Sequence, residues 1–164
     1  LRLSRSHPRF LIKLFENEVP ELANKTIDIK SVAREAGSRS KVAVTSSDSY
    51  IDPIGSLVGQ RGVRVATVTS ELGGEKIDII KWVDDQADFI TQALSPAKII
   101  SVVLNDEERK ATVTVDADQF SLAVGKGGQN VRLAAKLTGW KIDIVTPNGP
   151  VVEPVAEKAE EVVE

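Results

Sequence analysis

Two glycine-rich turns are the parts of this chain best suited to chemistry, because their backbone can bind an anion. They span residues 58–65 (VGQRGVRV) and 124–131 (VGKGGQNV). In each turn, two glycines three residues apart let the backbone bend sharply and expose its amide groups. A segment with helical apolar spacing follows each turn, and the first amides of a helix have no partner within that helix. Both turns are therefore predicted phosphate-binding sites.

Basic side chains beside the turns support this prediction. Arg61, Arg64 and Lys126 lie at or next to the predicted N-termini of helices, where the helix dipole disfavours a cation. A bound anion would remove that conflict. The alternative is that the glycines only end one helix and let the next one pack closely. The same turn in two matching contexts favours binding over this alternative.

The charge distribution indicates a polyanionic partner. The net charge is −3, but residues 151–164 hold five glutamates and one lysine, so the rest of the chain is slightly basic. Residues 119–142 contain four Lys and Arg and no acidic residue, and a second basic cluster lies at 30–41. Basic residues gathered near the glycine turns are typical of nucleic-acid binding.

Composition excludes several classes of chemistry. The chain has 164 residues, no cysteine and one histidine, so disulfides and thiolate catalysis are impossible and a metal site is not expected. No apolar run is long enough to span a membrane, and no signal peptide is recognisable. We therefore expect a cytoplasmic protein without a membrane segment or cofactor. Because the chain starts at Leu1 rather than a methionine, we expect it to be part of a longer protein.

The elements predicted around the first turn follow the order helix, strand, strand, helix, glycine turn, helix, strand. The signals, in chain order, are a helix from Pro8 that breaks at Pro20, strands around 27–32 and 42–44 with a turn at Gly37, a helix begun by Asp52-Pro53, a helix ended by Gly73, and a strand at 77–80.

The second half repeats this order with a shift of 66 residues. The shift aligns Gly59 with Gly125 and Asp52 with Asp118, so Asp118 is predicted to cap the helix before the second turn. The predicted organisation is a connector (1–7), two copies of one domain (8–82 and 83–146) and an acidic, disordered tail (147–164). Each copy is near the size at which a single core is marginal. We expect the copies to pack as one semi-rigid unit that offers both turns to one ligand.

These features resemble the KH family of single-stranded nucleic-acid binding domains, whose Gly-x-x-Gly loop clamps about four nucleotides. The resemblance extends to the tandem KH region of the NusA family of bacterial transcription factors, and it rests on residues 33–44 (AREAGSRSKVAV), 51–55 (IDPIG), 59–62 (GQRG), 128–134 (GQNVRLA) and 137–140 (LTGW). It implies an α/β (α+β) fold of two tandem type II KH domains, each a three-stranded mixed sheet packed on helices.

The resemblance also implies function and partners. Members of that family bind RNA polymerase and nascent RNA, act with other Nus factors, and modulate pausing, termination and antitermination. The expected ligand is single-stranded RNA, and the expected protein is a monomer and not an enzyme. Residues 1–6 would then be the segment that connects an upstream S1-type domain to the first KH domain. One departure from the family pattern is Gly127, which leaves Lys126 as the only charge in the second loop.

The predicted RNA-binding residues fall into three groups. The loop group is Gly59, Gln60, Arg61, Gly62, Arg64, Gly125, Lys126, Gly127, Gly128, Gln129, Asn130 and Arg132. The apolar groove group is Ile54, Val58, Ile77, Val124 and Ile142, and the extended basic group is Arg34, Arg39 and Lys41. For two of these sets of residues the sequence allows two roles each. Gln129 and Asn130 either read base edges or cap a helix, and the extended basic group either binds RNA or pairs with nearby acids.

Rival functions fit the sequence less well. A nucleotide-dependent enzyme would need a Walker loop with a lysine followed by Ser or Thr, and neither turn provides it. Asp78 and Asp143 recur in the two Ile-Asp-Ile strands, where a solvated or ion-paired role is expected rather than acid-base work. Trp82 and Trp140 are expected to pack in the core or between domains. A ribosome-associated or RNA-processing KH protein is the alternative that keeps the same chemistry.

Overall fold

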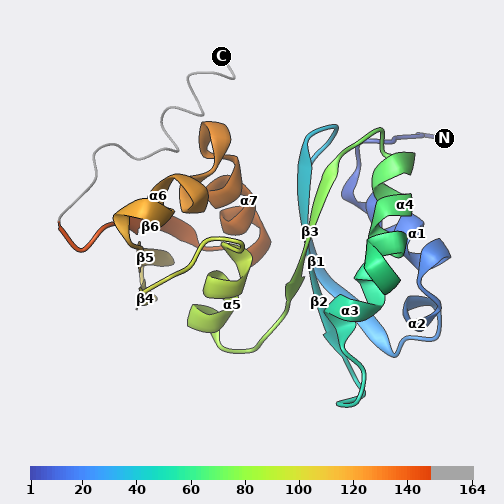
Figure 1. Ribbon diagram of the computed structural model, residues 1–164, viewed down its shortest axis with the longest axis horizontal. Coiled ribbons are helices and arrows are strands. Elements are labelled where there is room, and N and C mark those ends of the chain that lie inside the picture. Colours follow the sequence, from blue (N-terminus) through green and yellow to red (C-terminus); the bar gives the residue numbers. More distant parts are fainter. Residues whose placement is uncertain (149–164) are drawn as a thin grey trace. The chain divides into compact units, whose positions relative to one another are not determined.

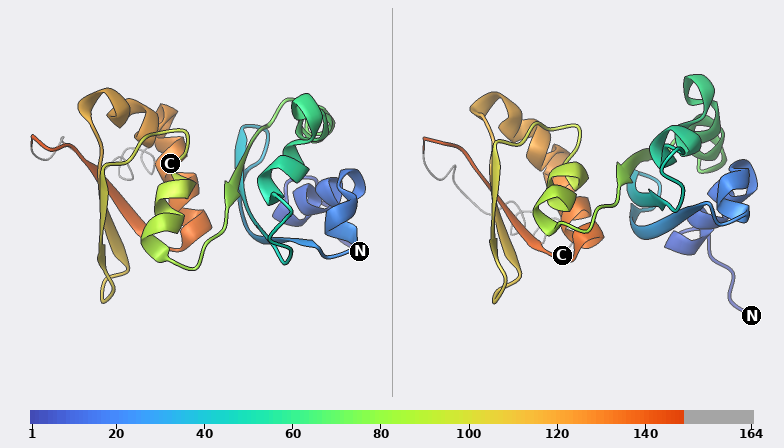
Figure 2. Two further views of the ribbon diagram at one scale, coloured as in Figure 1. Left: turned by 60° about the horizontal axis from the view of Figure 1, so that its bottom comes forward. Right: turned by 90° about the horizontal axis from the view of Figure 1, so that it is seen from below.

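The computed structural model describes residues 1–148, which form two α/β units (Figure 1). The first unit spans Leu1–Val83 and the second begins at Asp84. Each unit has a three-stranded sheet with its helices on one face, as two further views show (Figure 2). The predicted acidic tail lies outside the described residues from position 149 onward.

The first unit has the predicted order of elements. These are α1 (Pro8–Glu18), α2 (Pro20–Ala23), β1 (Ile27–Glu35), β2 (Arg39–Ser46), α3 (Pro53–Val58), the single turn η1 (Gln60–Gly62), α4 (Val63–Glu71) and β3 (Lys76–Lys81). The sheet order is β1-β2-β3, with β1 antiparallel and β3 parallel to the central strand β2. Pro20 was expected only to break the first helix, and it also begins the short helix α2.

Helix starts in this unit follow from the residues that precede them. His7 Nδ1 accepts a hydrogen bond from Arg9 N, and Asp52 Oδ1 accepts one from Ile54 N. A proline follows each cap at the first helical position, where its missing N–H costs nothing. The core then forms between the helices and the sheet, from residues that include Leu11, Phe15, Val42, Val44, Leu57 and Val68.

The second unit repeats the topology. Its elements are α5 (Gln86–Ala93), β4 (Ser101–Asn105), β5 (Lys110–Thr114), α6 (Ala117–Val124), the turn η2 (Lys126–Gly128), α7 (Gln129–Thr138) and β6 (Lys141–Val145). Here too the first pair of strands is antiparallel and the second pair is parallel. Each sheet is therefore mixed, as predicted, and the shared topology supports an internal duplication.

The start of α6 differs from the prediction. Asp118 was expected to be its N-cap, but the cap position is Asp116 and Asp118 lies inside the first turn. The difference follows from the residue that comes after Asp52 in the first copy and after Asp118 in the second. Pro53 lacks the N–H and clashes with a preceding helical turn, so α3 cannot begin earlier. Gln119 occupies the matching position in the second copy, and the helix extends two residues further toward its N-terminus.

Candidate nucleic-acid interface

The two glycine loops have almost the same backbone. Gly59 and Gly125, the first glycines, have φ of 78° and 80° with extended ψ values of 173° and 168°. The last glycines, at positions 62 and 128, are left-handed, with φ of 75° and 76°. The third position is left-handed as well, at φ 55° in Arg61 and 60° in Gly127. The sequence repeat is therefore a repeat of backbone geometry.

The first glycine of each loop is required by a close contact as well as by its φ. A Cβ atom on Gly59 would lie 2.7 Å from Cγ of Arg64, and one on Gly125 would lie 2.6 Å from the backbone N of Asn130. No atom lies within 4 Å of the corresponding position on Gly62 or Gly127. The first glycine thus lets the loop fold back against the helix that follows it.

Backbone hydrogen bonds leave two amides for a ligand in each loop. Gly59 N donates to Gly55 O at 2.9 Å, and Gly62 N donates to Gly59 O at 3.1 Å. Gly125 and Gly128 make the same two bonds, to Ser121 O and Gly125 O. Among the described residues of the two loops, the two middle amides of each loop, at positions 60 and 61 and at 126 and 127, donate no backbone hydrogen bond of this kind. This accounting narrows the predicted phosphate donors from four amides to two.

The cations at the loops are not equivalent. Arg61 and Lys126 are exposed, and neither has an acidic partner among the described residues. Arg64 is half-buried, and its Nη1 donates to Glu21 Oε2 at 3.1 Å and to Ser56 O at 2.8 Å. Arg132 Nη1 donates to Gly127 O at 3.1 Å, so this side chain braces the second loop from the next turn of α7.

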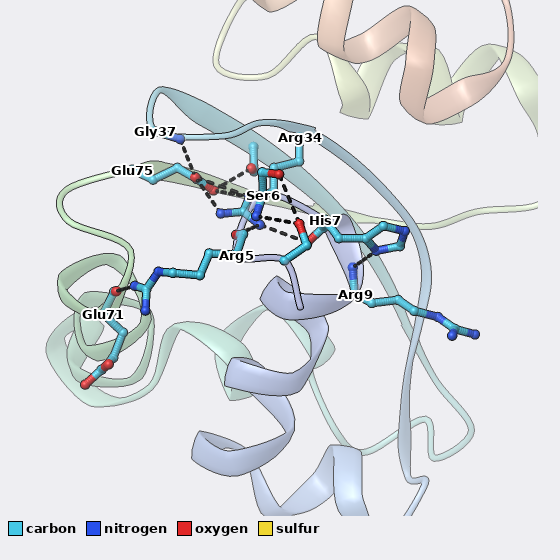
Figure 3. Close-up of polar contacts among 10 residues, drawn as sticks. Arg5, Ser6, His7, Arg9, Arg34, Gly37, Glu71 and Glu75 are labelled. Atoms are coloured by element: carbon cyan, nitrogen blue, oxygen red, sulfur yellow. Dashed lines mark hydrogen bonds and ion pairs between the residues drawn. The ribbon is translucent and has the colours of Figure 1, made fainter. Parts of the chain in front are cut away.

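Arg34 belongs to a buried network rather than to an exposed basic surface (Figure 3). Its Nε lies 3.1 Å from Glu75 Oε2, and the two side chains are 3% and 0% exposed. The Arg34 guanidinium also donates to the carbonyls of Arg5 and His7. Glu75 accepts further bonds from Gly37 N at 2.8 Å and from a serine hydroxyl. The network ties the entering chain, the β1–β2 turn and the start of β3 together.

Arg39 and Lys41 share one acidic partner. Arg39 Nη2 lies 2.7 Å and Lys41 Nζ lies 3.0 Å from the same oxygen, Asp78 Oδ2. The second copy has a related pair, Lys110 and Asp143, at 2.9 Å, and this pairing raises the pKa of the Lys110 ammonium. Both aspartates are therefore ion-paired, as predicted. Of the two roles considered for Arg34, Arg39 and Lys41, pairing with acids is the one observed.

Asn130 is turned away from solvent. Its side chain is buried, and Nδ2 donates to the carbonyls of Leu94 at 3.1 Å and Ala123 at 2.8 Å. These bonds join the C-terminal ends of α5 and α6 to the start of α7, so Asn130 holds the second loop in place. Gln129, the first residue of α7, is half-buried. We therefore leave Asn130 out of the proposed RNA contacts.

The apolar groove residues differ between the two copies. Ile54, Val58 and Ile77 are half-buried, which leaves part of each side chain available to a ligand. In the second copy Val124 is 8% exposed, and Ile142 is half-buried. Val58 of the first copy is thus more exposed than Val124, its counterpart in the second. Trp140 is buried and donates from Nε1 to Gln86 Oε1, which agrees with the predicted packing role.

Fold and loops together define the class of protein: each unit has the element order of a type II KH domain, with a Gly-x-x-Gly loop between two helices. Comparison with known families shows which KH domains these two units are. Residues 5–82 match the NusA-like first KH domain and residues 86–150 match the NusA-like second KH domain. The matches together span most of the chain. The chain belongs to the NusA-like KH family, and the predicted fold class is confirmed.

Curated relatives agree with this assignment. The chain is 56% identical over 142 residues to the transcription termination/antitermination protein NusA of Bacillus subtilis, covering 87% of this chain and 38% of that protein. It is 54% identical over 142 residues to the protein of the same name from Thermus thermophilus, covering 87% of this chain and 37% of the relative. The chain therefore spans less than two-fifths of the length of these relatives.

A solved structure shows the same fold at low sequence similarity. The crystal structure of APE1850 has a TM-score of 0.60 and 20% identity, covering 85% of this chain and 96% of that one. Within residues 1–148, no helix is long and apolar enough to cross a bilayer, and no cluster of three potential metal-binding side chains is found.

The Glu75 network predicts a pH-dependent stability. Burial alone would raise the pKa of Glu75, but hydrogen bonds from Arg34, Gly37 and Ser40 hold that pKa below its ordinary value of 4.5. A carboxylate with a lowered pKa stabilises the fold above its ordinary pKa, and this contribution is lost as pH falls through the lowered value. Glu75→Gln should cost about 3 kcal/mol at pH 7, because it leaves a buried guanidinium without its counter-charge.

The measurement is urea denaturation of both proteins from pH 7 down to pH 3. The difference between wild type and Glu75→Gln should shrink below pH 4.5. The control is Glu71→Gln, which changes an exposed carboxylate and should have little effect at any pH. A constant difference across the range would contradict the assigned ionic role of Glu75.

The loop geometry predicts unequal costs for alanine at two neighbouring glycines. Gly125→Ala places a methyl group against the backbone of α7 and should destabilise the second domain by several kcal/mol. Gly127→Ala meets no atom and should cost only the left-handed conformation, about 1 kcal/mol. Urea denaturation reported by Trp140 fluorescence, in a Trp82→Phe background, separates the two. Equal costs would show that the close approach at Gly125 is unimportant.

Proposed function

We propose that this chain binds single-stranded RNA through its two glycine loops, as the RNA-binding part of a transcription termination/antitermination factor. The observation that carries the proposal is that one loop backbone occurs twice, each time with two middle amides that, among the described residues, donate no backbone hydrogen bond like those of the outer glycines. Amides that point away from the protein at the start of a helix are suited to phosphate oxygens.

Each loop would bind a phosphate with backbone amides and one cation. The first loop offers the amides of Gln60 and Arg61 with the Arg61 guanidinium, and the second offers those of Lys126 and Gly127 with the Lys126 ammonium. Both cations are exposed. Arg64 and Arg132 contribute by holding the loops, since each already donates to protein oxygens. Phosphate contacts of this kind position a strand without reading its sequence.

The bases would lie along the apolar grooves beside the loops. In the first domain these contacts would come from Ile54 and Val58 of α3 and Ile77 of β3, whose half-buried side chains leave part of their surface for an unstacked base. In the second, Val124 and Ile142 hold the matching positions. Base recognition by KH domains depends on splayed, single-stranded nucleotides. A single strand that reaches both loops would gain affinity through effective concentration, because only residues 82–85 join β3 to α5.

The cellular role proposed here follows from the relatives. Proteins named transcription termination/antitermination protein NusA share more than half of the aligned residues with this chain. We therefore propose contact with nascent RNA, and association with RNA polymerase and other Nus factors through the full-length protein. The same relatives favour this role over a ribosome-associated one. We also propose that the protein is a monomer, that it is cytoplasmic and that it is not an enzyme.

Negative charge on the first loop tests the proposal directly. The double variant Gln60→Asp and Arg61→Asp places two carboxylates at the predicted phosphate site and should weaken RNA binding at least tenfold, as measured by fluorescence anisotropy with a labelled single-stranded RNA. The matched control is Lys13→Asp with Asn17→Asp, which changes the net charge equally on the exposed face of α1. Equal loss in both variants would mean that only overall charge matters, and unchanged affinity in the loop variant would overturn the clamp.

Salt dependence tests the contribution of each loop. Since Arg34, Arg39, Lys41 and Arg64 are engaged with protein carboxylates, we expect only about two or three phosphates to be neutralised. The log-log slope of affinity against salt should then be about −1.4 to −2.1 for a single strand. Lys126→Gln should make the slope shallower by about 0.7 if the second loop binds a phosphate. An unchanged slope would remove Lys126 from the interface.

A further inference from the structure

An open pocket of about 700 Å³ lies beside the first glycine loop and shares Gln60 with it, but the pocket contains none of the proposed groove residues Ile54, Val58 and Ile77. Its lining residues come from α2, from the segment before α3, and from the outer side of α3 and the loop. They include Tyr50, Asp52, Gly55, Gln60, Val63 and Arg64. None of the lining residues belongs to β3. The pocket therefore does not include Ile77, the β3 residue of the proposed base groove.

Two large apolar side chains at this pocket are exposed. Tyr50 is 97% exposed and Val63 is 61% exposed. The backbone under Tyr50 is nevertheless fixed, because Tyr50 N donates to Asp48 Oδ1 at 2.9 Å and Ile51 N donates to Asp48 O at 3.1 Å. An exposed aromatic ring on a fixed backbone, next to a phosphate site, has the arrangement of a stacking platform for single-stranded nucleic acid.

The charges in the pocket favour a base over a phosphate. The Arg64 guanidinium at this pocket is paired with Glu21 at 3.1 Å, so among the described residues of the pocket the carboxylate of Asp52 is left without a cation and would repel a phosphate. Asp52 Oδ2 lies over Gly55, only 2.8 Å from where a Cβ of that residue would stand. A carboxylate oxygen accepts hydrogen bonds from the N–H edge of a base. Gln60 belongs to both the pocket and the loop, and Tyr50 lines the same pocket, so the pocket connects the proposed phosphate site with the Tyr50 ring.

We propose that this pocket is a subsite for one unpaired nucleobase, which stacks on Tyr50 and contacts Val63 while the neighbouring phosphate binds the first loop. This inference rests on the proposed function and extends it by one nucleotide outside the groove. The subsite belongs to the first domain alone, because Asp116 and Gln129 occupy the positions of Tyr50 and Val63 in the second copy. The two domains therefore contact different lengths of RNA.

The experiment combines Tyr50 variants with a scan of the RNA. Affinity is measured for one single-stranded RNA and for versions in which each base in turn is replaced by an abasic site. Stacking on an aromatic side chain contributes about 1–3 kcal/mol per base, so Tyr50→Ala should weaken binding to the intact RNA about fivefold or more. Wild type should lose the same factor at one abasic position, and Tyr50→Ala should be insensitive to that position.

Control variants separate stacking from other effects. Tyr50→Trp keeps a ring and should retain the affinity. Val103→Ala removes an exposed apolar side chain from β4, far along the chain from the loop, and should change nothing. Circular dichroism of each variant checks that the fold is kept.

Failure of the inference is distinguishable from failure of the proposed function. If Tyr50→Ala binds every RNA as wild type does, or weakens all of them equally, the base subsite is overturned. If the Gln60→Asp and Arg61→Asp variant still loses binding in that case, the loop clamp stands without the subsite. If neither variant changes the affinity for RNA, both proposals fall.

Discussion

The close approach between the first glycine of each loop and the helix that follows it is the constraint on which both sites depend. A side chain at Gly59 or Gly125 would overlap with the residue five positions later. Because glycine has no side chain, the backbone can turn back against the following helix, where the outer two amides of the loop form internal hydrogen bonds and the middle two donate no bond of this kind. The proposed phosphate sites therefore follow from the shape of the backbone, and the cations beside them are additional to it.

Much of the positive charge near the loops serves the fold. Arg34 holds Glu75, Arg39 and Lys41 share Asp78, and Arg64 bonds to α2 and α3. Counting basic residues along the sequence therefore overestimates the charge available to a polyanion. In the function proposed here, binding would depend more on oriented backbone amides than on a high density of cations, and contacts of this kind to phosphates carry no sequence information.

The sequence was sufficient to predict the duplication, the order of elements and the fold class, because these depend on local signals. Glycine pairs, apolar spacing and caps such as Asp52-Pro53 act over a few residues. It was insufficient where partners are far apart. Glu75 lies 41 residues from Arg34, and Leu94 lies 36 residues from Asn130, so neither contact has a local signature. The start of α6 was misplaced because two nearby aspartates were both plausible caps, and the absence of a proline decided between them.

The difference between Arg61 and Gly127 gives the two loops unequal stiffness. Both positions adopt the left-handed region, but arginine has few other conformations open to it, whereas glycine has many. In the function proposed here, a strand bound at the first loop contacts a backbone with fewer alternative conformations than the backbone of the second loop. The second loop can then adjust to strands of more varied shape, and it loses more backbone entropy when it binds them.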